Sequence, residues 1–221
     1  MNPAMLSPTP PVTPSRASPP FSGRSLILGS TSRYRRELLQ RLRVPFEVSA
    51  PQVDETPQSG EAPQALAERL ALAKALAVAS AFPHAVVIGS DQVADLNGEP
   101  LGKPETHERA TTQLKQMSGQ IVVFHTAVAV VCLETSFQQT SLAAVRVQFR
   151  NLTDEEIENY LRAEQPYDCA GSAKSEGLGI ALLAAIDSDD PTALVGLPLI
   201  RTCAMIRAAG VVLLGAQGVA A

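Results

Sequence analysis

The stretch from Leu26 to Leu42 constrains the fold more than any other part of this 221-residue sequence. It reads LILGSTSRYRRELLQRL, so an apolar run leads through a small-residue turn into a helix with a basic first turn. The run Leu26–Leu28 is typical of a buried strand. Gly29 and the three hydroxyl residues that follow it supply a tight turn and a helix N-cap. A strand that passes directly into a helix predicts an α/β protein.

The first turn of this helix carries two arginines that point in different directions. At about 100° per residue, Arg35 projects close to Leu39 and Leu42, on the face that packs against the sheet. Arg36 is turned roughly a quarter-circle away. An arginine on the inner face needs an anion, so the turn, the helix dipole and the guanidinium together predict a phosphate site. The alternative interpretation is an amphipathic helix with two solvated arginines.

Composition limits the kind of partner that this protein binds. A net charge of −4 and a pI near 5.4 argue against binding of nucleic acid polymers, so the anion site should be a local pocket for a small molecule. No stretch offers about eighteen uninterrupted apolar residues, so we expect no membrane span. The three cysteines lack CxxC spacing, which favours reduced thiols and a cytoplasmic location. The three histidines lie far apart, which argues against a histidine metal cluster.

The chain divides into one domain with two short flanking segments. Residues 1–24 are rich in Pro and Ser and lack a secretory apolar core, so we expect a flexible extension. Residues 25–212 should form one α/β domain, and 213–221 a peripheral tail.

Two segments after the first helix carry charges of interest. The loop Val53–Thr56 contains Asp54 and Glu55, and it predicts either a divalent cation site or a solvated acidic turn. The helix expected over Glu61–Phe82 places Lys74 at the edge of its buried seam. From there the amine can reach a phosphate, although the residues by themselves favour an amine that extends to water.

A second apolar strand, Ala85–Ile88, runs into Gly89–Gln92, where we expect a turn. Asp91 would then lie at the carboxyl end of a strand, as a metal ligand or an activator of water, or as the carboxylate of an Asx-turn. Asn97–Gly98 predicts a type I′ hairpin that returns Lys103 toward Asp91.

The rest of the chain predicts scaffold and one further loop. We expect helices over Thr106–Ser118, Thr153–Glu164 and Leu199–Ala209, and antiparallel strands over Gln120–Leu133 and Ser141–Arg150. The small-residue loop 168–179 allows close approach to a flat ligand, and Glu176 in it can accept hydrogen bonds from a base. A plain flexible loop is the alternative.

Eight motifs in order resemble the Maf family of nucleoside triphosphate pyrophosphatases across residues 25 to 210. They are GSTSRYRRELL at 29–39, VDET at 53–56, RLALAKA at 69–75, GSDQV at 89–93, GKP at 102–104, LTDEEIENYL at 152–161, CAGSAKSEGLGI at 169–180 and LVGLPL at 194–199. The resemblance implies a mixed twisted sheet in two lobes around a central cleft, a fold shared with the inosine triphosphate pyrophosphatases. It also implies a frequent homodimer, and hydrolysis of a nucleotide to its monophosphate and pyrophosphate with a divalent cation, Mg²⁺ or Mn²⁺.

The resemblance also assigns roles to single residues. Asp91 matches the family's catalytic aspartate, and Glu55 matches an acidic position near the metal, so these two carboxylates are the expected metal ligands. The positions that match phosphate-handling residues are Ser30, Arg35, Lys74 and Lys103. Arg33 stands where family members commonly have proline, and we expect it to add a charge near the triphosphate and to tune affinity.

Three further positions separate the branches of the family. The branch that acts on dTTP and UTP has arginine, threonine and glutamine where this chain has Tyr34, Gln92 and Glu176. That combination resembles the branch that prefers 7-methyl-GTP. An aromatic face and a carboxylate suit a positively charged base with N–H donors. A dTTP/UTP pyrophosphatase of the same fold, and a non-catalytic nucleotide-binding regulator of cell division, are the alternatives.

Overall fold

The computed structural model describes residues 23–214 of the chain. The expected N-terminal extension therefore lies outside the described residues, except for Gly23 and Arg24 at its end. All but the first two residues of the expected tail also lie outside them. Among the helices of the described range, none has both the length and the apolar character that a bilayer span needs.

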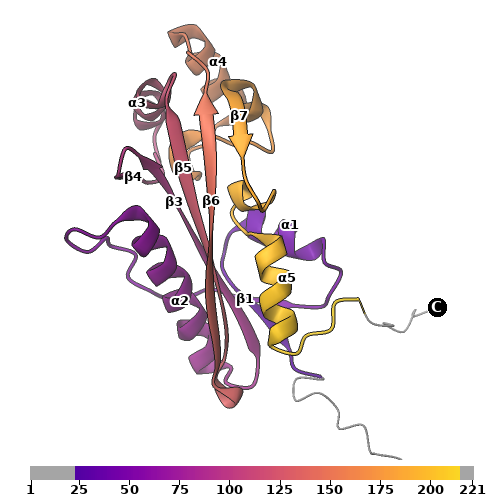
Figure 1. Ribbon diagram of the computed structural model, residues 1–221. Coiled ribbons are helices and arrows are strands. Elements are labelled where there is room, and N and C mark those ends of the chain that lie inside the picture. Colours follow the sequence, from indigo (N-terminus) through magenta and orange to yellow (C-terminus); the bar gives the residue numbers. More distant parts are fainter. Residues whose placement is uncertain (1–22, 215–221) are drawn as a thin grey trace, which may run out of the picture.

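Within residues 23–214, a seven-stranded mixed sheet runs through the whole molecule (Figure 1). Its strands are β1 (Leu26–Gly29), β2 (Glu47–Ser49), β3 (Val86–Leu96), β4 (Glu99–Leu101), β5 (Ile121–Cys132), β6 (Phe137–Phe149) and β7 (Leu183–Asp187). The order is β2-β1-β3-β5-β6-β7, with β4 paired to β3. β1 is parallel to β2 and to β3, and the remaining pairs are antiparallel. The predicted α/β fold with a mixed sheet is confirmed.

Five helices in the described part of the chain cover this sheet. They are α1 (Arg33–Gln40), α2 (Pro63–Ala81), α3 (His107–Met117), α4 (Asp154–Glu164) and α5 (Leu199–Ala208). In Figure 1, α2 covers one face of the lower half of the sheet, and α1 and α5 cover the other. α3 and α4 lie at the opposite end. Each end of the sheet has its own packed core, consistent with two lobes.

The strand β1 is buried on both faces because helices cover both. Leu26 and Leu28 pack into the cluster with α1 and α5, whereas Ile27 packs into the cluster with α2. This two-sided burial explains why the strand reads as a continuous apolar run. The predicted N-cap is confirmed, since the Ser32 side chain accepts a hydrogen bond from the Arg35 backbone N–H.

The turn predicted at Gly89–Gln92 is wrong, because β3 continues unbroken to Leu96. The antiparallel partner β5 pairs with it from Val87 to Asp95 and holds the small residues in an extended conformation. Gly89 serves the packing of α2, since a Cβ there would lie 2.3 Å from the Ala71 carbonyl oxygen and 2.5 Å from the Ala75 nitrogen. Asp91 therefore lies within a long strand, two residues beyond the point where β1 ends beside Gly89.

Several local predictions agree with the structure and two elements differ. The hairpin between β3 and β4 has positive φ at Asn97 (57°) and Gly98 (91°), as a type I′ turn requires. The Thr153 capping box at the start of α4 is present. β6 begins at Phe137, earlier than predicted. β7 was not predicted, because its sequence LAAID is short, rich in alanine and mostly exposed at the sheet edge.

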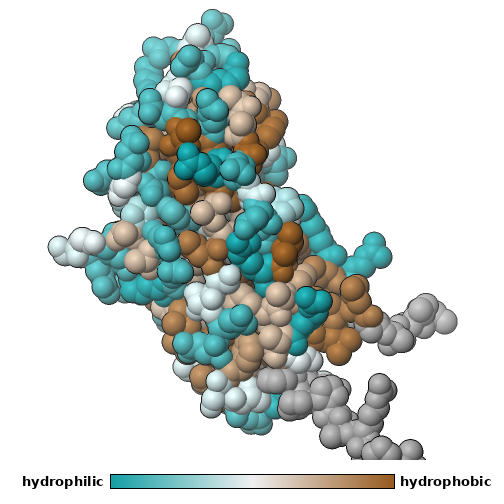
Figure 2. Space-filling view, in the orientation of Figure 1, coloured by the Kyte–Doolittle hydropathy of each residue, from teal (hydrophilic) through white to brown (hydrophobic). Residues whose placement is uncertain are grey.

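Apolar side chains gather on the surface near α5 and the end of the described chain. Figure 2 shows apolar residues gathered beside α5, at the lower right of the view. The exposed large apolar side chains in this region of the sequence are Ile200, Val212 and Leu214, whereas Val211 and Leu213 pack against the core. Of the expected tail, the structure describes Leu213, which is partly buried, and Leu214, which is exposed.

The contact between α2 and β3 predicts that Gly89→Ala destabilises the protein. The added methyl group would displace the helix backbone, at a cost of about 2 kcal/mol. We expect the midpoint of thermal unfolding to fall by about 5 °C. Gly102→Ala is the matched control, since nothing lies within 4 Å of the added atom. Equal midpoints for the two variants would contradict this account of the packing.

Candidate active site

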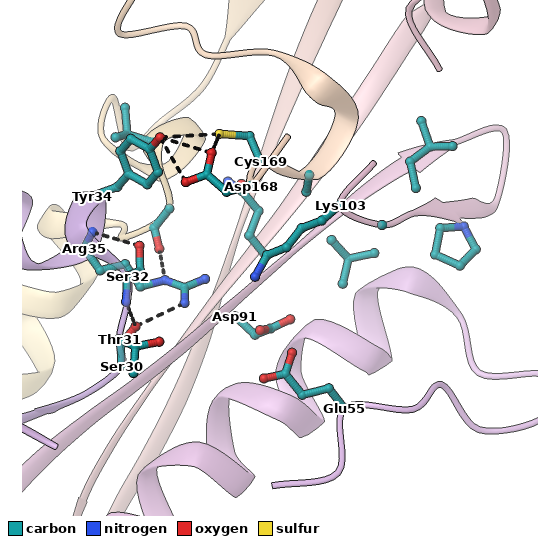
Figure 3. A pocket seen from close by; sticks show the side chains of 18 of the residues that line it. Ser30, Thr31, Ser32, Tyr34, Arg35, Glu55, Asp91, Lys103, Asp168 and Cys169 are labelled. Carbon is teal, nitrogen blue, oxygen red and sulfur yellow. Dashed lines mark hydrogen bonds between the residues drawn. The ribbon is translucent and has the colours of Figure 1, made fainter. Parts of the chain in front are cut away.

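One cavity of about 840 Å³ gathers every residue to which the family resemblance assigned a catalytic, metal-binding, phosphate-binding or base-selecting role. Its walls come from the β1–α1 turn, the acidic loop, α2, β3, the segment after β4 and the loop after α4. The proposed residues that line it are Ser30, Tyr34, Arg35, Glu55, Lys74, Asp91, Gln92, Lys103 and Glu176. Figure 3 shows Arg35, Lys103 and Asp91 pointing into the same space.

A buried ion pair joins α2 to β3 at the floor of the cavity. The ammonium nitrogen of Lys74 lies 2.6 Å from Asp91 Oδ1 and 2.9 Å from Glu55 Oε1. The Lys74 side chain is 7% exposed and that of Asp91 is 10% exposed. The preference for a solvated Lys74 is therefore wrong: the side chain stays within the buried seam of α2 because a carboxylate on β3 meets it there.

The helix α2 also holds the acidic loop in place. Arg69 donates to both carboxylate oxygens of Glu61, at 2.6 and 2.8 Å, and to the backbone carbonyl of Thr56 at 3.1 Å. The Asp54 carboxylate accepts the Thr56 N–H at 2.9 Å and closes a turn around Glu55. The loop is thus tied to α2 at two points, through Thr56 to Arg69 and through Glu55 to Lys74. Arg69 was not among the site residues predicted from the sequence.

The acidity of Glu55 reflects the cations around it. Burial acts to raise the pKa of its carboxyl group. The hydrogen bond and charge of Lys74, with smaller contributions from Lys103 and Arg35, outweigh burial and hold this pKa below its ordinary value. Because its side chain is 58% exposed, Glu55 keeps access to the cavity while it contacts Lys74.

Arg35 enters the cavity from α1, while Arg36 is exposed, as the helical spacing predicted. The Nε of Arg35 donates to the Gly196 carbonyl oxygen at 2.8 Å, and the Nη1 of Arg35 donates to Ser30 Oγ at 3.4 Å. Burial lowers the pKa of the guanidinium, against the opposing charges of Asp91 and Glu55. A half-buried guanidinium held at one edge leaves its other N–H groups for an anion.

The other end of the cavity is built around Tyr34. Its hydroxyl accepts a hydrogen bond from Arg33 Nη2 at 2.7 Å and donates to the Asp168 carboxylate at 3.4 Å (Figure 3). The Cys169 thiol lies 3.7 Å from the same hydroxyl. Burial raises the pKa of Tyr34 to about 12, although the Arg33 hydrogen bond opposes the shift. The hydroxyl is thus protonated, and able to donate, throughout the neutral range.

Asp168 and Cys169 were not singled out as site residues from the sequence. Both belong to the small-residue loop 168–179, and the presence of the proposed base-binding Glu176 in the same loop was the available signal. Arg33 also differs from expectation, since it contacts Tyr34 and not the cluster of Ser30, Arg35 and Lys74.

Gln92 and Glu176 line the cavity in different ways. The Gln92 amide donates to Thr126 Oγ1 and to the carbonyl oxygens of Ala193 and Leu194, at 2.9 to 3.0 Å. Its N–H groups therefore hold the segment before Gly196, and its amide oxygen is the group left to meet a ligand. Glu176 is exposed on the loop opposite.

The donor set fits a divalent cation that binds together with a phosphate chain. Within residues 23–214, no group of three or more His, Cys, Asp or Glu side chains is arranged to hold a metal ion. Asp91 and Glu55 already share one positive charge, the Lys74 ammonium. Mg²⁺ in phosphate-transferring enzymes commonly takes one or two carboxylates and completes its shell with phosphate oxygens and water.

The buried pair predicts strong coupling between Lys74 and Asp91 in stability. Lys74→Met removes the cation nearest to the buried Asp91 carboxylate and should lower the free energy of unfolding by about 3 kcal/mol. Asp91→Asn leaves the Lys74 ammonium with Glu55 alone and should lower it by somewhat less than about 3 kcal/mol. The double variant should lose at least 1 kcal/mol less than the sum, roughly the coupling of contacting residues. Denaturant titrations of the four proteins measure this. Additive losses would show that the two groups do not interact.

The anchor of the acidic loop predicts a pH-dependent loss of stability. The Arg69 hydrogen bond lowers the pKa of Glu61 from 4.5 to about 2. Ionised Glu61 therefore stabilises the fold above pH 4.5, and this contribution is lost as the pH falls toward 2. Glu61→Gln should unfold at less urea than the parent at pH 7, and the gap should narrow at pH 3. Glu68→Gln, on the same helix, is the control; a gap that stays constant with pH would refute the assignment.

Comparison with known proteins agrees with this geometry. The family model described as Maf-like protein matches residues 25–209. A protein of Polaromonas sp. (strain JS666 / ATCC BAA-500), named 7-methyl-GTP pyrophosphatase, is 75% identical over 213 residues, 96% of this chain and 97% of its own length. Proteins of the same name are 70% identical in Albidiferax ferrireducens, over 87% of this chain and 97% of theirs, and 60% identical in Burkholderia pseudomallei, over 89% and 93%.

The family match spans both lobes and every residue of the cavity named above. The relatives match this chain over nearly their whole length, so the similarity is not confined to one motif. This chain belongs to the Maf-like protein family.

Proposed function

We propose that this protein is a nucleoside triphosphate pyrophosphatase that hydrolyses 7-methyl-GTP to 7-methyl-GMP and diphosphate. The observation that carries the proposal is the contact of Lys74 with Asp91 and Glu55 in the cavity that also receives Arg35 and Lys103. The names of the relatives, at 60 to 75% identity, support the choice of substrate.

The cationic end of the cavity suits a triphosphate. Arg35 presents a forked donor, Lys103 and Lys74 supply ammonium groups, and the Ser30 hydroxyl lies beside the guanidinium. These groups bind the phosphate chain and stabilise the negative charge that develops on the leaving diphosphate. Lys74 can exchange a carboxylate oxygen for a phosphate oxygen, because its ammonium has three donors.

Asp91 acts as the base in this proposal. A water oxygen attacks the α-phosphorus, the bond to the β-phosphate bridging oxygen breaks, and Asp91 accepts the proton of the water. Mg²⁺ or Mn²⁺, held by Asp91, Glu55 and the phosphates, would neutralise charge on the reacting phosphoryl group. The Lys74 ammonium, 2.6 Å from Asp91 Oδ1, holds the carboxylate in place within the cavity.

The opposite end suits a positively charged purine. Tyr34 offers an aromatic ring, and Glu176 offers a carboxylate that can accept N–H groups of guanine. Methylation at N7 gives the base a positive charge, which both groups favour over a neutral base. Uracil and thymine carry neither that charge nor the guanine amino group.

Two further properties complete the proposal. Cys132, Cys169 and Cys203 are unpaired, which supports a cytoplasmic enzyme. The family resemblance supports a homodimer, which sedimentation of the purified protein would test.

The substrate assignment is tested by pyrophosphate release from 7-methyl-GTP, GTP, UTP and dTTP, with and without Mg²⁺ or Mn²⁺. We expect the highest kcat/KM for 7-methyl-GTP, and activity only with metal. A preference for UTP and dTTP would instead assign the other branch of the family. Tight nucleotide binding without pyrophosphate release would favour a regulatory protein.

The role of Asp91 is tested in the same assay with Asp91→Asn. Loss of the base should lower kcat by about 100-fold or more. Asp187→Asn, which changes an exposed carboxylate on β7, is the matched control and should retain parental activity. Asp91→Asn with activity close to the parent's would rule out the assigned role.

A further inference from the structure

The Tyr34 end of the cavity holds charges that the proposed chemistry does not use. The Arg33 guanidinium carbon lies 4.7 Å from the centroid of the Tyr34 ring, and Arg33 Nη2 donates to the Tyr34 hydroxyl at 2.7 Å. The same nitrogen is 3.9 Å from the Asp168 carboxylate. Arg33 and Tyr34 belong to the first turn of α1, whereas Asp168 lies in the loop after α4. The three residues therefore bridge two walls of the cavity.

Arg33 resembles the proposed ligand in its chemistry. A guanidinium is a flat, delocalised cation with N–H donors, and it stacks on aromatic rings for that reason. A 7-methylated guanine is also a flat, delocalised cation with N–H donors. The chain's own arginine thus lies over the ring that the proposed base would contact.

The charges around Tyr34 separate into a fixed pair and an exchangeable one. Lys174, whose ammonium lies 6.0 Å from the ring centroid, is paired with Glu164 at 2.8 Å, and the two side chains are 12% and 20% exposed. Arg33 and Asp168 are 58% and 57% exposed, and their separation is longer. Arg33 is therefore the cation that can leave the ring, and Asp168 is the carboxylate beside it that can receive it.

We infer that Arg33 and Asp168 are specificity-determining residues that act in opposite directions on the choice between a cationic and a neutral purine nucleotide. Arg33 competes with a positively charged base for the Tyr34 ring. Asp168 favours the cationic base, because it draws Arg33 away from the ring and adds negative charge to this end of the cavity. The inference rests on the proposed function and adds two residues to the base-selecting set.

The direction of each effect follows from charge. Removal of the Asp168 charge leaves Arg33 without its countercharge, so a cationic base meets more repulsion and a neutral base does not. Removal of the Arg33 charge relieves that repulsion and frees the ring. Tyr34 remains in both cases, so a general loss of the aromatic wall does not account for opposite changes.

The test compares kcat/KM for 7-methyl-GTP with kcat/KM for GTP in each variant, and the ratio of the two values is the readout. Asp168→Asn should lower the ratio by about threefold, and Arg33→Gln should raise it by about threefold, as expected for exposed charges near an aromatic ring. Asp168→Glu should keep the parental ratio, because it keeps the charge.

Two controls remove the same charges elsewhere. Arg36→Gln changes an exposed arginine of the same helix that does not line the cavity, and Asp187→Asn changes an exposed carboxylate on β7. Both should leave the ratio at the parental value. Thermal unfolding of each variant confirms that it is folded, and the Arg33→Gln result decides the question by itself if Asp168→Asn does not fold.

The outcomes separate this inference from the proposed function. If the parent protein hydrolyses 7-methyl-GTP no better than GTP, the proposed function is wrong, and the inference about Arg33 and Asp168 is then wrong as well. If the parent prefers 7-methyl-GTP, and both variants keep its ratio or shift it in the same direction, the function stands and the inference about Arg33 and Asp168 is wrong.

Discussion

The Lys74 ammonium, held between the Asp91 and Glu55 carboxylates, is the contact on which the rest of the site depends. Burying an unpaired charge lowers the stability of the fold, so the folded chain must bring all three groups close together. α2 carries Lys74 along its buried seam, β3 carries Asp91, and Arg69 ties down the loop that carries Glu55. The distances of 2.6 and 2.9 Å show that these elements meet in register.

The charge balance of this cluster bears on the proposed binding of a triphosphate together with a metal ion. Three cations, Lys74, Arg35 and Lys103, share the cavity with the two carboxylates, so these groups leave one positive charge unbalanced. One charge cannot neutralise a triphosphate, which carries several negative charges. A divalent cation bound by the carboxylates and the phosphates would supply the difference, and it would release the Lys74 ammonium to the phosphates.

The sequence predicts the local structure better than the site. The hairpin at Asn97–Gly98 and the capping box at Thr153 depend on neighbouring residues, and both are present. The continuation of β3 through Gly89–Gln92 depends on its pairing with β5, and the burial of Lys74 depends on its contact with Asp91. Because these partners are distant in sequence, no local sequence pattern predicts either feature. The gathering of distant residues into one cavity was anticipated through the family resemblance, whereas helical spacing by itself placed only Arg35.

The contact between Tyr34 and Asp168 was not predicted for the same reason. The two residues are 134 positions apart, so no local sequence pattern indicates that they meet. They also show how one helix turn links chemistry to substrate choice. Consecutive residues of α1 point to different ends of the cavity: Tyr34 meets Asp168, and Arg35 meets Gly196 beside the proposed phosphate-binding groups. A substitution at Arg33 changes the surroundings of the base without touching the Arg35 contacts. A substitution at the proposed base-binding end can therefore alter that end while the contacts of the charged cluster around Lys74 stay the same.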